Sequence, residues 1–206
     1  MIQFKLNGEP LSIPTAWDEL TTSQYLQILD LKDDYLQVVS ILSGMDYEII
    51  KKAEINGLEH LIIATSFLQK PADFGGTCDK VGSYTLHKND KGQFNIQFES
   101  LAQFEDMRNV MKSCVDAKTT AQAFPKFVAI YLQKIRDGEY SYSKAMEMVT
   151  EVLTLPAKEV IITGSFFYVK LRSLLNGTPA TSLPISPSPK KKKPVSKGSR
   201  KSSGRR

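Results

Sequence analysis

The sequence predicts an α+β protein that is predominantly α-helical: a multi-helix domain with two small β-hairpins and a disordered basic C-terminal tail. Along most of the chain, apolar residues recur three or four positions apart, which is the helical period. Two short segments instead alternate apolar and polar residues, as hairpin strands do. After Asn176-Gly177 the composition shifts to serine, proline and lysine. We therefore expect a helical domain over residues 1–177, with hairpins near 2–13 and 83–98, and a disordered tail over residues 178–206.

The first hairpin is predicted by alternation over residues 2–6 and 11–13, on either side of Asn7-Gly8. Asn-Gly is a strong hairpin signal, because both central residues of a type I′ turn need a positive φ. Pro14 is expected to stop the second strand, since it has no N–H to donate.

The helix that follows carries several start signals at once. Thr21 is a good N-cap, and Gln24 three residues later completes a capping box. Leu20 and Tyr25 occupy the positions of a hydrophobic staple. Trp17, the only tryptophan, is suited to cover the joint between the first hairpin and the helices. These features predict a helical core with a fixed entry and imply no catalytic group.

Further helices are expected before the second hairpin. One should run from Asp33-Asp34 to Gly44, which suits a left-handed position after a helix. A shorter one should cover residues 46–54, and a third residues 58–68, stopped by Pro71.

The second hairpin is predicted where Tyr84 and Leu86, and then Phe94, Ile96 and Phe98, alternate with polar residues. A two-stranded hairpin is marginal alone, so this one should pack on the helices or on a partner.

The second half of the domain is expected to be helical. The first helix there should bury a face made of Leu101, Phe104, Met107, Met111, Cys114 and Val115. Pro125 suits the first turn of the next helix, where its missing N–H costs nothing. The apolar stripe of that helix comprises Phe124, Phe127, Val128, Tyr131, Leu132 and Ile135, and Gly138 should end it. Ser141 or Ser143 should begin another helix, with Met146, Val149 and Leu153 on its apolar face.

The last helix, after Pro156, is apolar on nearly every side over residues 160–169. Such a helix is either central in the core or a contact surface. In the second case its candidate residues for binding a client or for self-association are Ile162, Phe166, Phe167 and Val169. Recognition would then place a helix of the partner in a groove, with Phe166 or Phe167 as the anchor.

The net charge of +5 divides into a mildly acidic body and a basic tail. Residues 190–206 hold nine of the 27 Lys and Arg and no acid, so the remaining residues carry 18 bases against 22 acids. The nine candidate nucleic-acid contacts are Lys190, Lys191, Lys192, Lys193, Lys197, Arg200, Lys201, Arg205 and Arg206. There are two alternatives to nucleic-acid binding by this segment. It can serve only to keep the protein in solution, or its run of lysine codons can cause frameshifting.

No catalytic constellation is visible in the sequence. His60 and His87 are read as ordinary side chains, and Cys78 and Cys114 have no metal-ligand spacing or committed base beside them. We expect no cofactor, no metal ion and no enzyme activity. No secretory signal and no run of about 20 apolar residues is present, so a cytoplasmic protein without a membrane partner is expected.

Several short motifs resemble those of a loose group of proteins from long-tailed bacteriophages, the tail assembly chaperones and their relatives. The motifs are Trp17-x-Glu19-Leu20-Thr21-x-x-Gln24-Tyr25, Ile41-Leu42-Ser43-Gly44, residues 124–131, and Pro156 followed by Phe166-Phe167. The resemblance implies a small helical cytoplasmic protein that keeps a tape-measure protein or other tail proteins soluble during virion assembly, and it brings no catalytic residue. The second hairpin and the chain length depart from the group. A virion structural component (a connector or tail-associated protein) and a nucleic-acid-binding accessory protein are the alternatives.

Overall fold

The computed structural model describes residues 1–6, 9–31, 34–52, 61, 63–70, 72–76, 78–87 and 100–176. It confirms the predicted fold class, since α-helices dominate and two antiparallel two-stranded sheets accompany them. The N-terminal elements are β1 (Ile2–Leu6), β2 (Glu9–Ile13), α1 (Thr22–Asp30), α2 (Tyr35–Ser43) and α3 (Tyr47–Lys51), with short 3-10 helices η1 (Trp17–Glu19) and η2 (Ser66–Gln69). They are followed by β3 (Lys80–Val81), β4 (Tyr84–Thr85), α5 (Leu101–Lys112), α6 (Ala117–Asp137), α7 (Tyr142–Thr154) and α8 (Ala157–Asn176).

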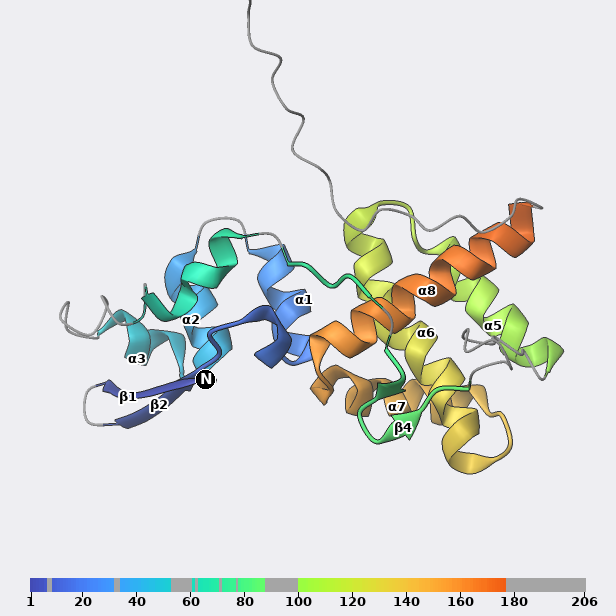
Figure 1. Ribbon diagram of the computed structural model, residues 1–206, viewed down its shortest axis with the longest axis horizontal. Coiled ribbons are helices and arrows are strands. Elements are labelled where there is room, and N and C mark those ends of the chain that lie inside the picture. Colours follow the sequence, from blue (N-terminus) through green and yellow to red (C-terminus); the bar gives the residue numbers. More distant parts are fainter. Residues whose placement is uncertain are drawn as a thin grey trace, which may run out of the picture.

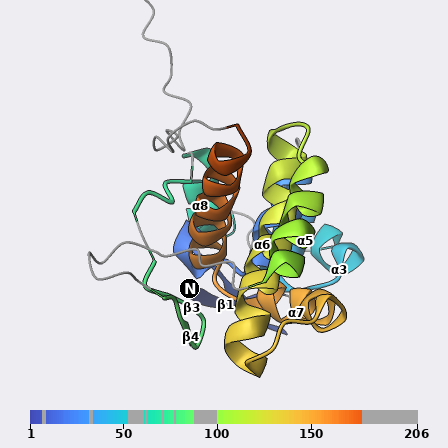
Figure 2. The same ribbon diagram turned by 90° about the vertical axis from the view of Figure 1, so that its right-hand side faces the viewer.

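The helices fall into two groups that lie side by side (Figure 1). We call β1, β2, α2 and α3 the N-terminal lobe, and α5 to α8 the C-terminal bundle. Within the bundle α6 contacts α5, α7 and α8, and Figure 2 shows α5, α6 and α8 running alongside one another. Helix α1 lies between the two groups and contacts α6, α7 and α8 as well as α2. One apolar core runs through both groups.

Helix α6 is the centre of the bundle. Every residue from Ala123 to Gln133 except Lys126 is buried. Helix α8 crosses it so closely that a Cβ atom added to Gly164 would lie 2.4 Å from the Cβ atom of Phe124. The predicted stripe of α6 is confirmed for Phe124, Phe127, Val128, Tyr131 and Leu132, whereas Ile135 is half-buried.

The first helix begins as the sequence predicts. Thr21 accepts a hydrogen bond from the Gln24 amide, and the Gln24 side chain accepts one from the Thr21 amide. The Gln24 side-chain amide also donates to the carbonyls of Ile41 and Leu42, which ties α1 to α2. The capping box therefore fixes both the start of α1 and its position against α2.

The first hairpin and two helix ends are also confirmed. β1 pairs with β2 in antiparallel register, from Ile2 opposite Ile13 to Leu6 opposite Glu9, whereas the Asn7-Gly8 turn lies outside the described residues. Gly44 and Gly138 adopt φ values of 69° and 77° after α2 and α6, in the left-handed region that glycine favours.

Two expectations about the second half are wrong. Pro125 lies inside α6 and not in its first turn; the helix begins at Ala117, after a capping box of Asp116 and Thr119. Leu101 and Val115 are not core residues, since they are 77% and 81% exposed. Leu101 is the first residue of α5 and Val115 follows its end. The rest of the predicted face does lie against the core, with Met107 buried and Phe104, Met111 and Cys114 half-buried, whereas the prediction omitted buried Gln103 and Val110.

The buried face of α7 also differs from the prediction by one position. Ala145, Met148 and Val152 are buried, whereas Met146, Val149 and Leu153 are half-buried. The 3.6-residue period allows both faces, and only the position of α6 decides between them.

The second hairpin differs from the prediction in its described part. Tyr84–Thr85 pairs with Lys80–Val81, two residues upstream, around a turn at Gly82 and Ser83. Residues 88–99, which contain the predicted partner strand, lie outside the described residues, as do His60 and positions 58, 59 and 62 of the expected helix over 58–68. The described part of that helix is helical as predicted, since positions 61 and 63–65 are α-helical and η2 follows them. Among the described residues, no helix has the length and apolar character needed to cross a membrane.

Candidate functional site

Helix α8 changes character halfway along its length. Its middle stretch over residues 160–164 is buried on all sides, and the buried residues of its first three turns are Ala157, Val160, Ile161, Ile162, Thr163, Gly164 and Phe167. In the last two turns only Leu171 is buried, whereas Leu174 and Leu175 are 63% and 39% exposed. Both interpretations of this helix therefore apply, each to a different half.

The four predicted contact residues are divided between core and surface. Ile162 and Phe167 are 6% and 3% exposed, so they belong to the core. Phe167 packs on Tyr131 of α6, with ring centroids 4.8 Å apart. Phe166 and Val169 are half-buried, and the Lys170 ammonium lies 5.8 Å from the Phe166 ring centroid.

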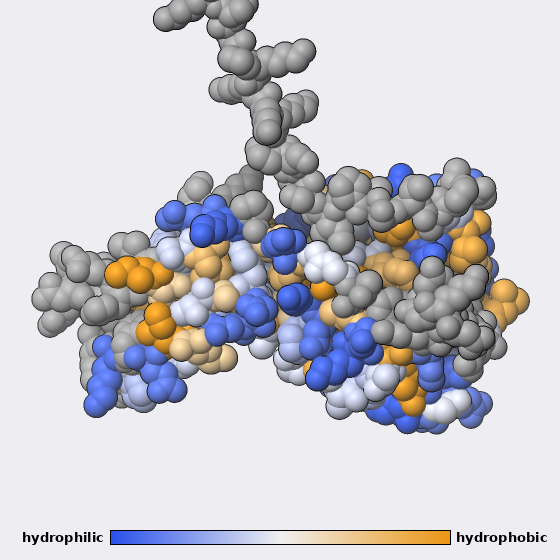
Figure 3. All heavy atoms as spheres, in the orientation of Figure 1, coloured by the Kyte–Doolittle hydropathy of each residue, from blue (hydrophilic) through white to orange (hydrophobic). Residues whose placement is uncertain are grey.

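The accessible apolar side chains of α8 are Phe166, Val169, Leu174 and Leu175, and we call them together the distal α8 surface. Phe166, Val169 and Leu174 lie on one broad side of the helix, and Leu175 lies on the side opposite to Phe166. Neither Leu174 nor Leu175 was among the contact residues predicted from the sequence, although both lie in the last turn before the composition changes. On the face drawn in Figure 3, hydrophobic side chains occur in small groups on both lobes and do not form one continuous patch. The nine predicted tail contacts, Lys190 to Arg206, lie outside the described residues.

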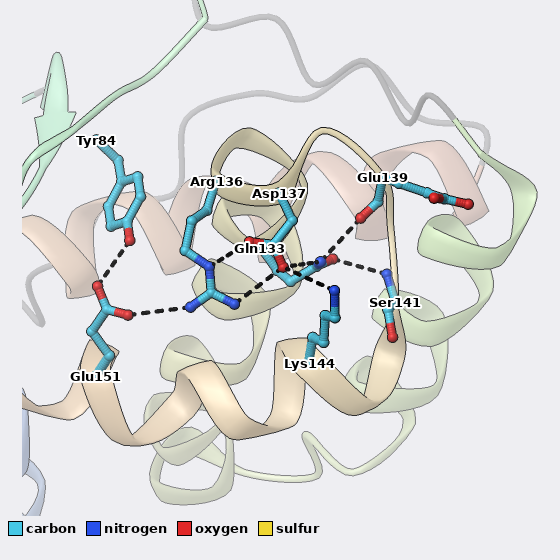
Figure 4. Close-up of polar contacts among 8 residues, drawn as sticks. All are labelled: Tyr84, Gln133, Arg136, Asp137, Glu139, Ser141, Lys144 and Glu151. Carbon is cyan, nitrogen blue, oxygen red and sulfur yellow. Dashed lines mark hydrogen bonds and ion pairs between the residues drawn. The ribbon is translucent and has the colours of Figure 1, made fainter.

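A polar network joins α6, α7 and β4 (Figure 4). The Tyr84 hydroxyl donates to Glu151 at 2.9 Å, and Glu151 lies 3.5 Å from the Arg136 guanidinium. Arg136 also binds both carboxylate oxygens of Asp137, at 2.7 and 3.2 Å. This bidentate pair, with a further hydrogen bond from Gln133, lowers the pKa of Asp137 to about 2.

The same network fixes the turn between α6 and α7. The Gln133 side chain is fully buried; it donates to the Glu139 carbonyl and accepts from the Ser141 amide. Next to it, the Tyr140 hydroxyl donates to Asp106 of α5 at 2.7 Å, and burial together with that carboxylate raises the pKa of Tyr140. All these side chains have structural partners, so we assign the network to stability.

Trp17 occupies an aromatic cluster beside the start of α8. Its ring makes edge contacts with Tyr25, Phe67 and Phe74, with centroids 6.0, 5.3 and 6.5 Å away. Its indole N–H donates to the Lys70 carbonyl at 3.1 Å. The expected corner position is therefore found, although the partners come from α1 and residues 67–74. Beside the cluster lies an open hollow of about 360 Å³.

Neither cysteine has the environment of an activated thiol. Burial raises the pKa of Cys78 and of Cys114, and the nearby Glu159 carboxylate raises that of Cys78 further. Both thiols are therefore protonated at neutral pH. His87 is exposed, and the described residues contain no group of three or more His, Cys, Asp or Glu placed to hold a metal ion.

Comparison of the chain with models of known protein families, with curated proteins and with solved structures finds no match.

Proposed function

We propose that this protein is a non-enzymatic assembly factor that binds an apolar helical segment of a client protein through the distal α8 surface. The observation that carries the proposal is the change along α8, from a stretch over residues 160–164 that is buried on all sides to a last part with exposed leucines. A helix that continues beyond the core it packs on, and still carries large apolar side chains, is well suited to receive a partner.

The energy available at this surface favours a moderate, reversible interaction. Fully burying one leucine side chain contributes about 1.5–3 kcal/mol relative to leaving it exposed. Leu174 and Leu175 are the most accessible members, and Phe166 and Val169 can extend the contact. A partner helix with apolar residues three and four positions apart would match the side of α8 that carries Phe166, Val169 and Leu174.

The particular client proposed is a tape-measure or other tail protein of a long-tailed bacteriophage. It rests on the motifs at Trp17 to Tyr25, Ile41 to Gly44, residues 124–131 and Pro156 to Phe167, and it is consistent with the exposed leucines of α8. Such a factor would act in the cytoplasm of the host cell.

A co-expression experiment tests this proposal. The long helix-rich reading frame expected next to this gene would be expressed with and without the protein, and the soluble fraction and co-purification of its product measured. We expect the product to be soluble only with the protein present. Leu174→Glu should abolish co-purification while leaving the circular dichroism spectrum unchanged.

The matched control is Arg172→Gln. It changes the net charge by the same amount on the same exposed part of α8, and it removes no apolar contact. Unchanged co-purification of Leu174→Glu would contradict the proposed surface. A protein found in stoichiometric amounts in purified virions would instead support a virion structural component.

The basic tail favours a second candidate function, non-specific nucleic-acid binding. Nine positive charges without an acid over residues 190–206 can displace counterions from phosphates, so affinity should fall steeply with salt. Truncation after Thr178 should abolish such binding. Equal DNA binding by the truncated and full chains would contradict this function.

A further inference from the structure

The hollow beside Trp17 has an aromatic floor. It lies between η1, the first turn of α8 and residues 67–70 and 72–74, and Trp17, Phe67 and Phe74 form its aromatic floor. Phe74 is buried, whereas Trp17 and Phe67 are half-buried, so part of the aromatic surface remains accessible. The edge contacts among these rings hold them in place.

The floor requires no polar ligand. The only polar atom of the indole ring, its N–H, already donates to the Lys70 carbonyl at 3.1 Å. The aromatic floor can therefore make apolar contacts, and an aliphatic or aromatic group fits it better than a group that needs a hydrogen bond.

Charges of both signs surround this floor. Lys70 and Lys158 supply two cations and Asp18 and Asp73 two anions, and all four residues are exposed. Among the described residues, none of the four takes part in an ion pair. An apolar, aromatic centre with a charged, solvent-exposed rim is the usual anatomy of a protein–protein contact.

We propose that this hollow receives an apolar side chain of a protein partner, flanked in the partner's sequence by one acidic and one basic residue. The two carboxylates of the rim disfavour a nucleic acid or another phosphate, and the two ammonium groups disfavour a simple cation. The hollow is also open and near the lower end of the volumes of small-molecule sites. The site is separate from the distal α8 surface, because Lys158 lies in the first turn of that helix and Leu174 in its last.

Trp17 provides a direct readout, because it is the only tryptophan in the chain and lines the hollow. The probes are three acetylated and amidated pentapeptides at millimolar concentrations. The first is Glu-Gly-Phe-Gly-Lys, the second has alanine in place of phenylalanine, and the third has glutamine in place of both charged residues. Phenylalanine does not contribute to tryptophan emission, so a saturable change reports binding at the floor.

We expect the first peptide to change Trp17 emission saturably and the alanine peptide to have no effect. The glutamine peptide should bind roughly threefold more weakly, as the loss of exposed ion pairs predicts. Lys158→Gln should weaken binding of the first peptide by a similar factor. Lys126→Gln, at an exposed position of α6 that does not line the hollow, is the matched control and should bind normally.

Four results would overturn the proposal. The first is no saturable response to the phenylalanine peptide, and the second is an equal response to the alanine peptide. The third is equal binding of the charged and glutamine peptides, which would remove the role of the rim. N-acetyl-phenylalaninamide binding as tightly as the pentapeptide would also contradict a site for a protein segment. None of these outcomes depends on client binding at the distal α8 surface.

Discussion

The helices inside the C-terminal bundle are joined to one another differently from the way in which the N-terminal part, through α1, is joined to the bundle. In the bundle, α6 is almost completely buried and α8 crosses it at Gly164, in direct contact with Phe124. The link between α1 and the bundle also contains three hydrogen bonds to backbone carbonyls. The Thr22 amide and hydroxyl both donate to the Leu155 carbonyl at 2.9 Å, and the Ala157 amide donates to the Leu20 carbonyl at 2.8 Å.

Within the bundle the helices are held by packing, whereas at this link a few hydrogen bonds add to the apolar core that both groups share. We call the contact between residues 20–22 and 155–157 the α1 junction. The adjacent Gly82 adds to it, because its amide donates to Glu159 at 2.7 Å and it lies against the Leu155 side chain. Changes in the bundle should therefore affect the whole fold, whereas changes at the junction should loosen the lobe first.

The largest effect is expected for Gly164→Ala. Helix propensity alone would favour alanine by about 1 kcal/mol. The new methyl group, however, would lie 2.4 Å from the Phe124 Cβ atom and 2.9 Å from its Cα atom, so α6 and α8 must separate. We expect a net loss of about 3 kcal/mol in the free energy of unfolding, measured by urea denaturation.

Gly138→Ala is the control for this substitution. Gly138 has open space around its Cβ position and a φ of 77°, so only backbone strain of about 1–2 kcal/mol should appear. A stabilised Gly164→Ala protein would show that the two helices do not cross as closely as described.

The next effect concerns the junction, where Thr22→Val keeps the side-chain shape but removes the hydroxyl donor to Leu155. Thr22 is fully buried, and the lost hydrogen bond should cost about 1 kcal/mol. Amide hydrogen exchange should become faster in β2, α1 and α2 while α6 keeps its protection. Equal acceleration in α6 would contradict the distinction between lobe and bundle.

For Thr21→Ala, on the α1 side of the junction, we expect a similar or slightly smaller loss of stability. Loss of the N-cap should cost about 1 kcal/mol, which thermal denaturation can measure. Ser23→Ala is the neighbouring control, since its hydroxyl serves only as an acceptor for Gln27 on the exposed side of α1. Equal costs for both variants would show that the capping box is not the stabilising feature.

The smallest effect is expected at the edge of the bundle, for Asp137. Its pKa is lowered from the ordinary 3.8 to about 2, so its contribution to stability is present above pH 3.8 and disappears as the pH falls through about 2. Asp137→Asn should therefore be less stable than the natural chain at neutral pH. The difference between their urea midpoints should vanish near pH 2, and a difference independent of pH would contradict the ion pair with Arg136.

Much of the local structure could be predicted, because its causes lie within a few residues of one another. The capping box of Thr21 and Gln24, the glycine ends at Gly44 and Gly138 and the first hairpin all depend on neighbouring side chains and on φ preferences. The capping box of Asp116 and Thr119 is also a local signal. The start of α6 was nevertheless predicted near Pro125, because proline is common in the first turn of a helix.

The candidate sites depended on contacts that no local pattern contains. Apolar periodicity marked residues 160–169 as special, yet it could not separate buried Ile162 and Phe167 from half-buried Phe166 and Val169. That division follows from which side of α8 faces the neighbouring helices, as the contact of Phe167 with Tyr131 of α6 illustrates. Likewise, the hollow combines Trp17 with Phe74 and Lys158, which are far apart in the chain.

The sequence by itself determined where most described helices begin and end, since capping and turn formation are short-range interactions. It also determined that the chain divides into an acidic body and a basic tail. Only the tertiary structure decided which side of each helix is buried, because a helical period permits several faces and the neighbouring helix selects one. The position of Pro125 inside α6 was also decided by the tertiary structure. The free energy gained by burying the surrounding residues outweighs the loss of the backbone hydrogen bond that proline cannot donate.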